Sequence, residues 1–331
     1  MHTINLSKYS IRTDLLIENK NYNNYNNKTK YIDKIKVELT TSKNNKEHYT
    51  TISFDDVTDK DNFQKVEEVY TQELKEYITK LNLVNTDNVL IIGLGNEKST
   101  PDSLGPKSIK QVLVTKYLYS LGEVDKSYQS TSAFAPSVTS ITGIETSRAI
   151  KALIDTTESK LLIVIDSLAA SSLVRLNKTI QITDTGIHPG SGVGNNRQEL
   201  NQDTLGIPVI AIGVPTVVDA STIVSDTFKY MQEQFSYKLE HINDAKEKLI
   251  INKDYRNTEP LPEYVKKEVL GEVGALTEEE FKQLIDEVLT PINYNLMVTP
   301  TEIDFLIEKL SLLIGNGINK SLHKNYNSTN I

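Results

Sequence analysis

The hydrophobic positions of the chain change period along its length, and each period predicts a different element. Between residues 31 and 54 apolar and polar positions alternate, which predicts a β-hairpin with its turn at 42–47. The stretch before it, 19–30, is rich in Asn, Lys and Tyr and predicts a loop. From Phe63 to Leu81 apolar residues recur every three or four positions, which predicts a helix with one buried face.

Continuous apolar runs follow, and helical patterns separate them. The runs predict strands at 89–93, 160–165, 177–183 and 207–213. Helices are predicted over 104–121 and 145–155, and a loop rich in Ser, Thr, Ala and Pro over 127–142. Strands that are apolar throughout are typical of a sheet covered on both sides. We therefore expect an α/β fold, with a mostly parallel twisted sheet, helices on both faces and a small N-terminal β-rich part.

The last third of the chain is predicted to be helical. From about 228 to 290 the sequence is rich in Lys, Glu and Asp with weak helical periodicity, which indicates a helical insertion. A final amphipathic helix is expected over 301–318, packed back on the sheet. Residues 16–331 are expected to form a single α/β domain that includes this insertion.

Composition narrows the class of protein. The chain has 331 residues, 38% of them hydrophobic, and a formal net charge of −8. No basic block is present, so direct nucleic-acid binding is not expected. The absence of cysteine excludes disulfides and thiol catalysis. The N-terminus has no signal-peptide core and no run approaches about 18 apolar residues, so we expect a cytoplasmic protein without a membrane contact.

Two aspartates near the ends of predicted strands are the strongest candidates for chemistry. Asp102 follows the strand at 89–93, and Asp166 follows the strand at 160–165. The carboxyl ends of parallel strands share one edge of the sheet, where such folds place their sites. Two carboxylates brought together there share protons and split their pKa values, as acid–base chemistry requires. Taken singly, each aspartate is also a typical helix cap.

Other segments suggest weaker alternatives. Gly93 and Gly95 follow a strand, but a third glycine and an immediate helix are missing, which disfavours a dinucleotide site. The loop 184–197 contains His188 and several glycines, among them Gly190 and Gly192, whose backbone amides could approach a ligand. His188 could serve as an acid–base group or a metal ligand, although a loop histidine with a backbone partner is the commoner situation.

Several segments in one register give a more specific indication. They are Gly93–Asn96, Thr100–Pro106, Gly143–Thr146, Val164–Ala170, Thr179–Ile182, Asp184–Gly194, Ile207–Ala220 and Asn295–Pro300. Together they resemble the germination protease family, the spore endopeptidases of endospore-forming bacteria. The resemblance covers nearly the whole chain.

The resemblance implies an aspartic-type endopeptidase with a fold similar to the hydrogenase-maturation proteases. Its functional aspartates fall on Asp102 and Asp166, with Glu145, His188, Gly190 and Gly192 as supporting or substrate-binding candidates. It implies small acid-soluble spore proteins as substrates, the forespore or spore core as location, and a homotetramer. It also implies a zymogen with a propeptide, residues 1–15, removed by self-cleavage between Leu15 and Leu16. No cofactor or metal is expected.

Two other functions stay open at this point. In the first, Asp102 and Asp166 bind a metal ion together with Glu145 or His188, as in a hydrogenase-maturation-type peptidase. In the second, the chain binds spore proteins without cutting them. Sensitivity to a chelator tests the first alternative, and self-cleavage tests the second.

Overall fold

The computed structural model describes residues 13–19, 22–122, 124–188, 198–244, 246, 255, 258, 261–289 and 296–326. The chain divides into two compact units. The larger unit contains the described residues within 12–170, 174–217 and 299–331. The smaller unit contains those within 171–173 and 218–298.

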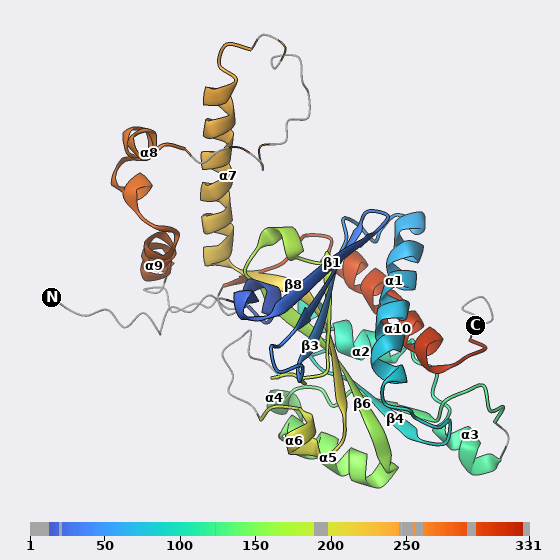
Figure 1. Ribbon diagram of the computed structural model, residues 1–331. Helices are drawn as coiled ribbons and strands as arrows, with labels where there is room; N and C mark the ends of the chain where they lie inside the picture. Colours follow the sequence, from blue (N-terminus) through green and yellow to red (C-terminus); the bar gives the residue numbers. More distant parts are fainter. Residues whose placement is uncertain are drawn as a thin grey trace. The chain divides into compact units, whose positions relative to one another are not determined.

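A mixed sheet organises the larger unit, with strand order β1-β2-β3-β7-β8-β6-β4-β5 (Figure 1). Its strands are β1 Asn26–Ile32, β2 Ile35–Thr41, β3 His48–Ser53, β4 Asn88–Gly93, β5 Thr131–Phe134, β6 Ser159–Ala170, β7 Thr179–Thr183 and β8 Val209–Asp219. β4 runs parallel to both β5 and β6. The antiparallel strands β1, β2, β3 and β7 extend the sheet. The predicted α/β class is confirmed.

Helices cover both faces of this sheet, as the continuous apolar runs predicted. The helices of the larger unit are α1 Lys60–Thr79, α2 Leu104–Ile109, α3 Lys116–Leu121, α4 Thr139–Thr142, α5 Thr146–Thr157, α6 Gln202–Leu205 and α10 Ile303–Leu322. On one face Ile91 and Ile163 join a core that includes residues of α1 and α10. On the other face Ile92 and Leu162 pack with Ile150 of α5.

The single helix predicted over 104–121 is wrong, because the chain forms α2 and α3 with a break between them. The break occurs where backbone groups bond outside any helix. Leu113 N–H donates to Asn319 Oδ1 of α10 at 2.9 Å. Thr115 N–H donates to the Thr131 carbonyl of β5 at 3.1 Å. These long-range partners replace the helical hydrogen bonds.

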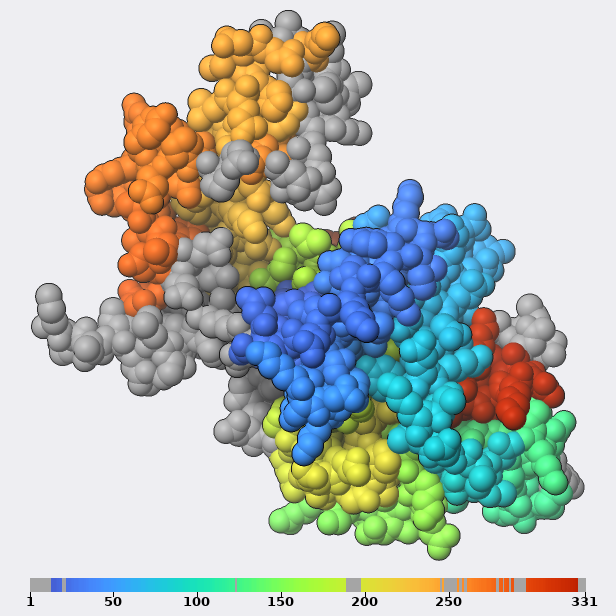
Figure 2. All heavy atoms as spheres, in the orientation of Figure 1, coloured from blue at the N-terminus to red at the C-terminus, as the bar shows by residue number. Residues whose placement is uncertain are grey.

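Two segments predicted as loops contain strands. Residues 26–30 belong to β1, which pairs with β2 and exposes nearly all of its polar side chains (blue in Figure 2). Because β1 buries little, no apolar alternation marks it in the sequence. The predicted loop 127–142 contains β5 and the short helix α4. The predicted turn at 42–47 is confirmed, since Ser42 N–H donates to the Glu47 carbonyl at 3.0 Å.

The smaller unit is helical in its described residues. It contains α7 Ala220–Glu240, α8 Glu263–Leu270, a 3-10 segment Gly271–Ala275, α9 Glu278–Leu289 and the short strand β9 Met297–Val298. Phe228 of α7 stacks on Phe281 of α9 with ring centroids 4.2 Å apart. Within the part of the chain that the structure describes, no helix has the length and apolar character needed to cross a bilayer.

Candidate active site

Asp102 ends a short 3-10 turn, η4 (Thr100–Asp102), between β4 and α2. Its main-chain carbonyl and its Oδ2 both accept the Asn96 N–H, each at 2.9 Å. Thr216 of β8 donates its hydroxyl to the Pro101 carbonyl of the same turn at 2.7 Å. These contacts hold Asp102 beside the carboxyl end of β4, where the sequence predicted it.

Glycines allow this turn to pack closely against the end of β4. A Cβ on Gly105 would lie 2.2 Å from the Leu94 carbonyl oxygen. Gly95 has a φ of +113°, and a Cβ there would lie 2.0 Å from the Asp102 carbonyl oxygen. Only glycine adopts this backbone angle and approach without strain. The glycines after β4 therefore position an aspartate, and no dinucleotide site is needed to explain them.

Asp166 lies within β6, because this strand continues to Ala170. The prediction that Asp166 follows the end of the strand is therefore wrong. Asp166 is buried, and the alternation of the strand puts it on the same face as Leu168. Its Oδ1 accepts the Ser167 N–H at 2.8 Å.

The structure brings Asp102 and Asp166 to the same edge of the sheet. β4 and β6 are parallel neighbours with Gly93 opposite Ile165. Leu94 N–H continues this ladder by donating to the Ile165 carbonyl at 2.8 Å. The turn that ends in Asp102 contacts β6. Asp102 and Asp166 therefore share one edge of the sheet as predicted, while the catalytic roles of the aspartates remain a prediction.

Two of the supporting candidates from the sequence contact other residues of the larger unit. Glu145 precedes α5 and accepts the Ser147 hydroxyl at 2.6 Å. His188 Nε2 lies 3.2 Å from Glu199 Oε1. Gly190 and Gly192 lie outside the described residues. Within the described ranges, no group of three or more His, Asp or Glu side chains could hold a metal ion.

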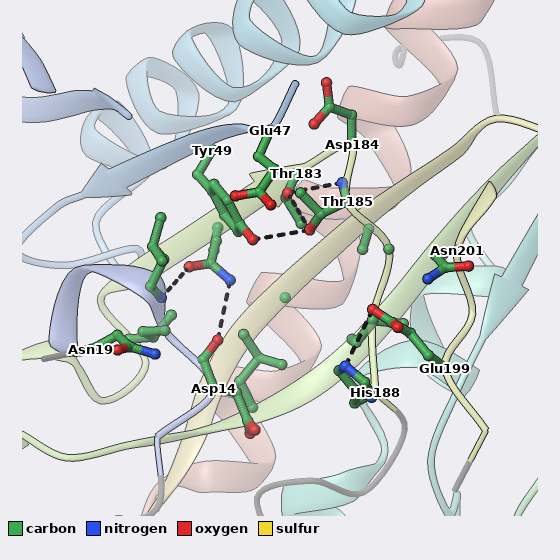
Figure 3. Close-up of a pocket in the computed structure, with 18 of the residues that line it drawn as sticks. Asp14, Asn19, Glu47, Tyr49, Thr183, Asp184, Thr185, His188, Glu199 and Asn201 are labelled. Carbon is green, nitrogen blue, oxygen red and sulfur yellow. Dashed lines mark hydrogen bonds and ion pairs between the residues drawn. The ribbon is translucent and has the colours of Figure 1, made fainter. Parts of the chain in front are cut away.

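A pocket of about 880 Å³ opens beside β6, β7 and β8 (Figure 3). It is lined by Thr13, Asp14, Leu15, Leu16, Asn19, Lys46, Glu47, Tyr49, Leu168, Gln181, Thr183, Asp184, Thr185, Gly186, Ile187, His188, Glu199, Asn201, Gln202, Asp203, Ala211 and Gly213. Asp102 and Asp166 are not among these residues. The nearest lining residue on the face of Asp166 is Leu168, about 7 Å further along the strand.

The bond predicted for self-cleavage, Leu15–Leu16, lies in the wall of this pocket. The Leu15 side chain is only 1% exposed. The Gln181 amide of β7 accepts the Leu16 N–H at 2.9 Å and donates to the Asp14 carbonyl at 3.3 Å. Asp14 and Ala169 of β6 exchange two further hydrogen bonds. A segment near the N-terminus thus forms part of the pocket wall and is held there by hydrogen bonds to β6 and β7.

The far wall of the pocket is acidic and partly buried. Asp184 accepts the His48 N–H at 2.8 Å through Oδ1, and its Oδ2 lies 2.6 Å from His48 Nδ1. Burial raises the pKa of the Tyr49 phenol on the same wall. The hydroxyls of Thr185 and Tyr49 are hydrogen-bonded at 3.1 Å. The wall can therefore orient polar groups of a ligand.

Two residues of this pocket region were missed by sequence reasoning. Gln181 was included in a run treated as continuously apolar, 177–183. Its signal is the alternation of Thr179, Gln181 and Thr183 with two isoleucines, which indicates one polar face. Arg175 lies 3.4 Å from Glu18 (Nε to Oε1), a pair that no local pattern reveals.

The open α/β sheet, with two carboxylates at one edge and a pocket beside it, defines an α/β protein with a candidate active site at that edge. Comparison with known proteins narrows this class. The family model for the germination protease matches residues 6–331. The germination protease of Bacillus pumilus (strain SAFR-032) is 39% identical over 99% of this chain and 97% of its own length.

Other similar proteins belong to the same family. The germination protease of Bacillus subtilis (strain 168) is 39% identical over 99% of this chain and 97% of its own length. That of Bacillus velezensis (strain DSM 23117 / BGSC 10A6 / LMG 26770 / FZB42) is 44% identical over 85% of this chain and 79% of its own length. The chain therefore belongs to the germination protease family, as its segments indicated.

Proposed function

We propose that this chain is an endopeptidase of spore germination that begins the degradation of small acid-soluble spore proteins in the spore core. Membership of the germination protease family supports the protease activity. We propose further that the chain is made as a zymogen and removes residues 1–15 by cutting the Leu15–Leu16 bond.

The observation that carries this proposal is the position of the Leu15–Leu16 bond. Both residues line the pocket, and Gln181 contacts the backbone on both sides of Leu15. The pocket adjoins β6, the strand that contains Asp166. Since neither Asp102 nor Asp166 lines the pocket, the bond has to shift towards them before it can be cut. This separation agrees with a latent, uncut form.

The proposed mechanism uses Asp102 and Asp166 as one coupled unit. Two close carboxylates do not both ionise readily, so the pair holds one proton over a range of pH. The ionised carboxylate takes a proton from water, whose oxygen attacks the Leu15 carbonyl carbon. The protonated carboxyl then gives its proton to the Leu16 nitrogen as the C–N bond breaks. The products are a Leu15 carboxylate and a Leu16 amine.

The test follows self-cleavage of the full chain by intact mass. Asp102→Asn and Asp166→Asn should each lower its rate by at least about 10³-fold while the circular dichroism spectrum stays unchanged. Asp155→Asn on the exposed side of α5 is the matched control and should cut at the normal rate. Full cleavage by either site variant refutes the dyad, and loss of cleavage on adding a chelator favours the metal-dependent alternative.

We propose a homotetramer as the working assembly. Light scattering of the purified chain at several concentrations gives the mass directly. A monomer at all concentrations contradicts this part of the proposal and leaves the dyad untouched.

A further inference from the structure

The backbone around Asp102 is held by hydrogen bonds from inside and from outside its turn. Inside the turn, Asp102 N–H donates to the Ser99 carbonyl at 2.8 Å, and the Asp102 carbonyl accepts the Asn96 N–H at 2.9 Å. From outside, the Thr216 hydroxyl of β8 donates to the Pro101 carbonyl at 2.7 Å. The Pro101 carbonyl and the Asp102 N–H belong to one planar peptide group, so bonds at both of its ends fix its orientation.

The hydrogen bond from Thr216 spans the strand that contains Asp166. In the sheet β6 lies between β4 and β8, and neighbouring strands are about 4.8 Å apart. Asp102 follows β4, whereas Thr216 belongs to β8, so the bond joins segments on opposite sides of β6. It therefore fixes the turn that ends in Asp102 relative to the strand that contains Asp166.

Thr216 is itself held in place. Its side chain is fully buried, and a β-branched side chain on a strand has few rotamers to choose from. The Thr299 hydroxyl donates to the Thr216 carbonyl at 2.9 Å. The chain leaves the larger unit after Val217 and returns to it at Thr299. We call the Thr299 and Thr216 hydroxyls the threonine tether, because together they join three segments of the larger unit that are distant in the sequence.

We propose that Thr216, supported by Thr299, is a positioning residue for the proposed peptide hydrolysis, because it sets the distance between Asp102 and Asp166. Two carboxylates share a proton only when they are close. A turn that keeps its local hydrogen bonds but loses the threonine tether leaves Asp102 free to move away from Asp166. The effect on rate rests on the proposed function, whereas the effect on the mobility of the turn does not depend on catalysis.

The first experiment removes the Thr216 hydroxyl and keeps the shape of the side chain. Thr216→Val should lower kcat for a spore-protein peptide by about 10- to 100-fold and leave KM nearly unchanged. Thr216→Ser restores the hydroxyl and should recover most of the loss. Thr131→Val is the matched control, because Thr131 is also fully buried on a strand and donates its hydroxyl to the Leu113 carbonyl at 2.7 Å.

The control should keep its kcat, since Thr131 lies on β5 and makes no printed bond to the turn of Asp102. A folded Thr216→Val chain with normal kcat contradicts the proposal. An absence of recovery in Thr216→Ser contradicts it as well, because a merely structural defect of the packed strand does not depend on one hydroxyl.

The second experiment tests whether the two threonines act as one path. Thr299→Val should lower kcat several-fold. The double variant Thr216→Val with Thr299→Val should match Thr216→Val alone, because Thr299 acts through Thr216. A double variant that shows the product of the two separate losses refutes the supporting role of Thr299.

The third experiment needs no catalysis and follows amide hydrogen exchange at Asp102. Thr216→Val should raise the exchange rate of the Asp102 N–H several-fold, and Thr216→Ser should restore it, while Thr131→Val should leave it unchanged. An unchanged exchange rate in Thr216→Val overturns the inference, whether or not the chain cuts peptides. If the unaltered chain cuts no peptide, the proposed function fails, and the exchange rate alone then decides whether Thr216 positions Asp102.

Discussion

Replacing Gly95 by alanine should show whether the position of Asp102 controls the catalytic rate when the fold is kept. A Cβ at this residue would lie 2.0 Å from the Asp102 carbonyl oxygen, whereas ordinary contact begins at 3.4 Å. The turn that carries Asp102 must therefore move by about 1.4 Å. The same methyl would lie 3.0 Å from Asp102 Oδ1, so the carboxylate has to move as well.

The expected effect on activity is large and the effect on stability is moderate. A misplacement of about 1 Å at a reacting group costs about 10²-fold in rate. Gly95→Ala should therefore lower kcat for a spore-protein peptide by about 10²-fold and leave KM nearly unchanged, since the groups that contact residues 14–16 are not touched. The left-handed backbone at φ +113° adds a strain of about 1–2 kcal/mol to the folded state.

The assay compares Gly95→Ala with Gly122→Ala by steady-state kinetics and urea unfolding. Gly122 also has a positive φ, +75°, but a Cβ there would meet no atom within 4 Å. The control should therefore lose some stability and keep its kcat. A folded Gly95→Ala chain with normal kcat would show that the position of Asp102 does not limit the reaction, and the reasoning would be refuted.

Two further predictions concern buried polar groups of the larger unit. Burial lowers the pKa of His323 from 6.5 to about 4. The unfolded chain then takes up the proton first as the pH falls, so the free energy of unfolding should drop by about 3 kcal/mol between pH 6.5 and 4. His323→Gln, which can still accept the Gln129 N–H that His323 Nδ1 accepts at 3.2 Å, should lack this component in urea titrations; equal slopes contradict the prediction. Asn88 Nδ2 donates to Ser159 Oγ at 2.7 Å and to Ser132 Oγ at 2.9 Å, and so links β4 to both neighbours. Asn88→Ala should lower the free energy of unfolding by about 2–3 kcal/mol in thermal or urea unfolding, and a loss below about 0.5 kcal/mol would count against this role.

Sequence periodicity predicted the elements that bury a face and missed those that do not. α1 and the strands β4 and β6 each present an apolar pattern of their own, so their existence followed from the sequence. β1 is mostly exposed and is held in the sheet by its pairing with β2. No local sequence pattern predicts this pairing. The break between α2 and α3 depends on Asn319, about 200 residues away in the chain, and is equally invisible locally.

The candidate site divides in the same way. Asp102 and Asp166 could be predicted to share an edge, because the topology of parallel strands fixes where their ends lie. The role of Arg175 could not be predicted in this way. Its ion pair with Glu18 joins two segments that are far apart in the sequence and belong to no common helix, strand or repeat. Contacts between loops that are distant in the sequence can be identified only once the fold is known.

The side chains of β7 and β8 explain how the segment around Leu15 can cross the sheet. In the antiparallel register Gln181 is opposite Gly213, and Thr183 is opposite Ala211. The long side chain of Gln181 therefore has a glycine beside it, and Thr183 has only the methyl group of Ala211 beside it. The resulting space is open above β8 and bordered by hydrogen-bonding groups on β7. A segment that runs from Ala169 on β6 to Gln181 on β7 has to pass β8, which lies between them in the sheet. Enlarging Gly213 would close this passage, and its Cβ would already lie 2.3 Å from Leu168 Cδ1. The small residues of β8 thus leave the space that this segment needs, and the polar groups of β7 supply its hydrogen bonds.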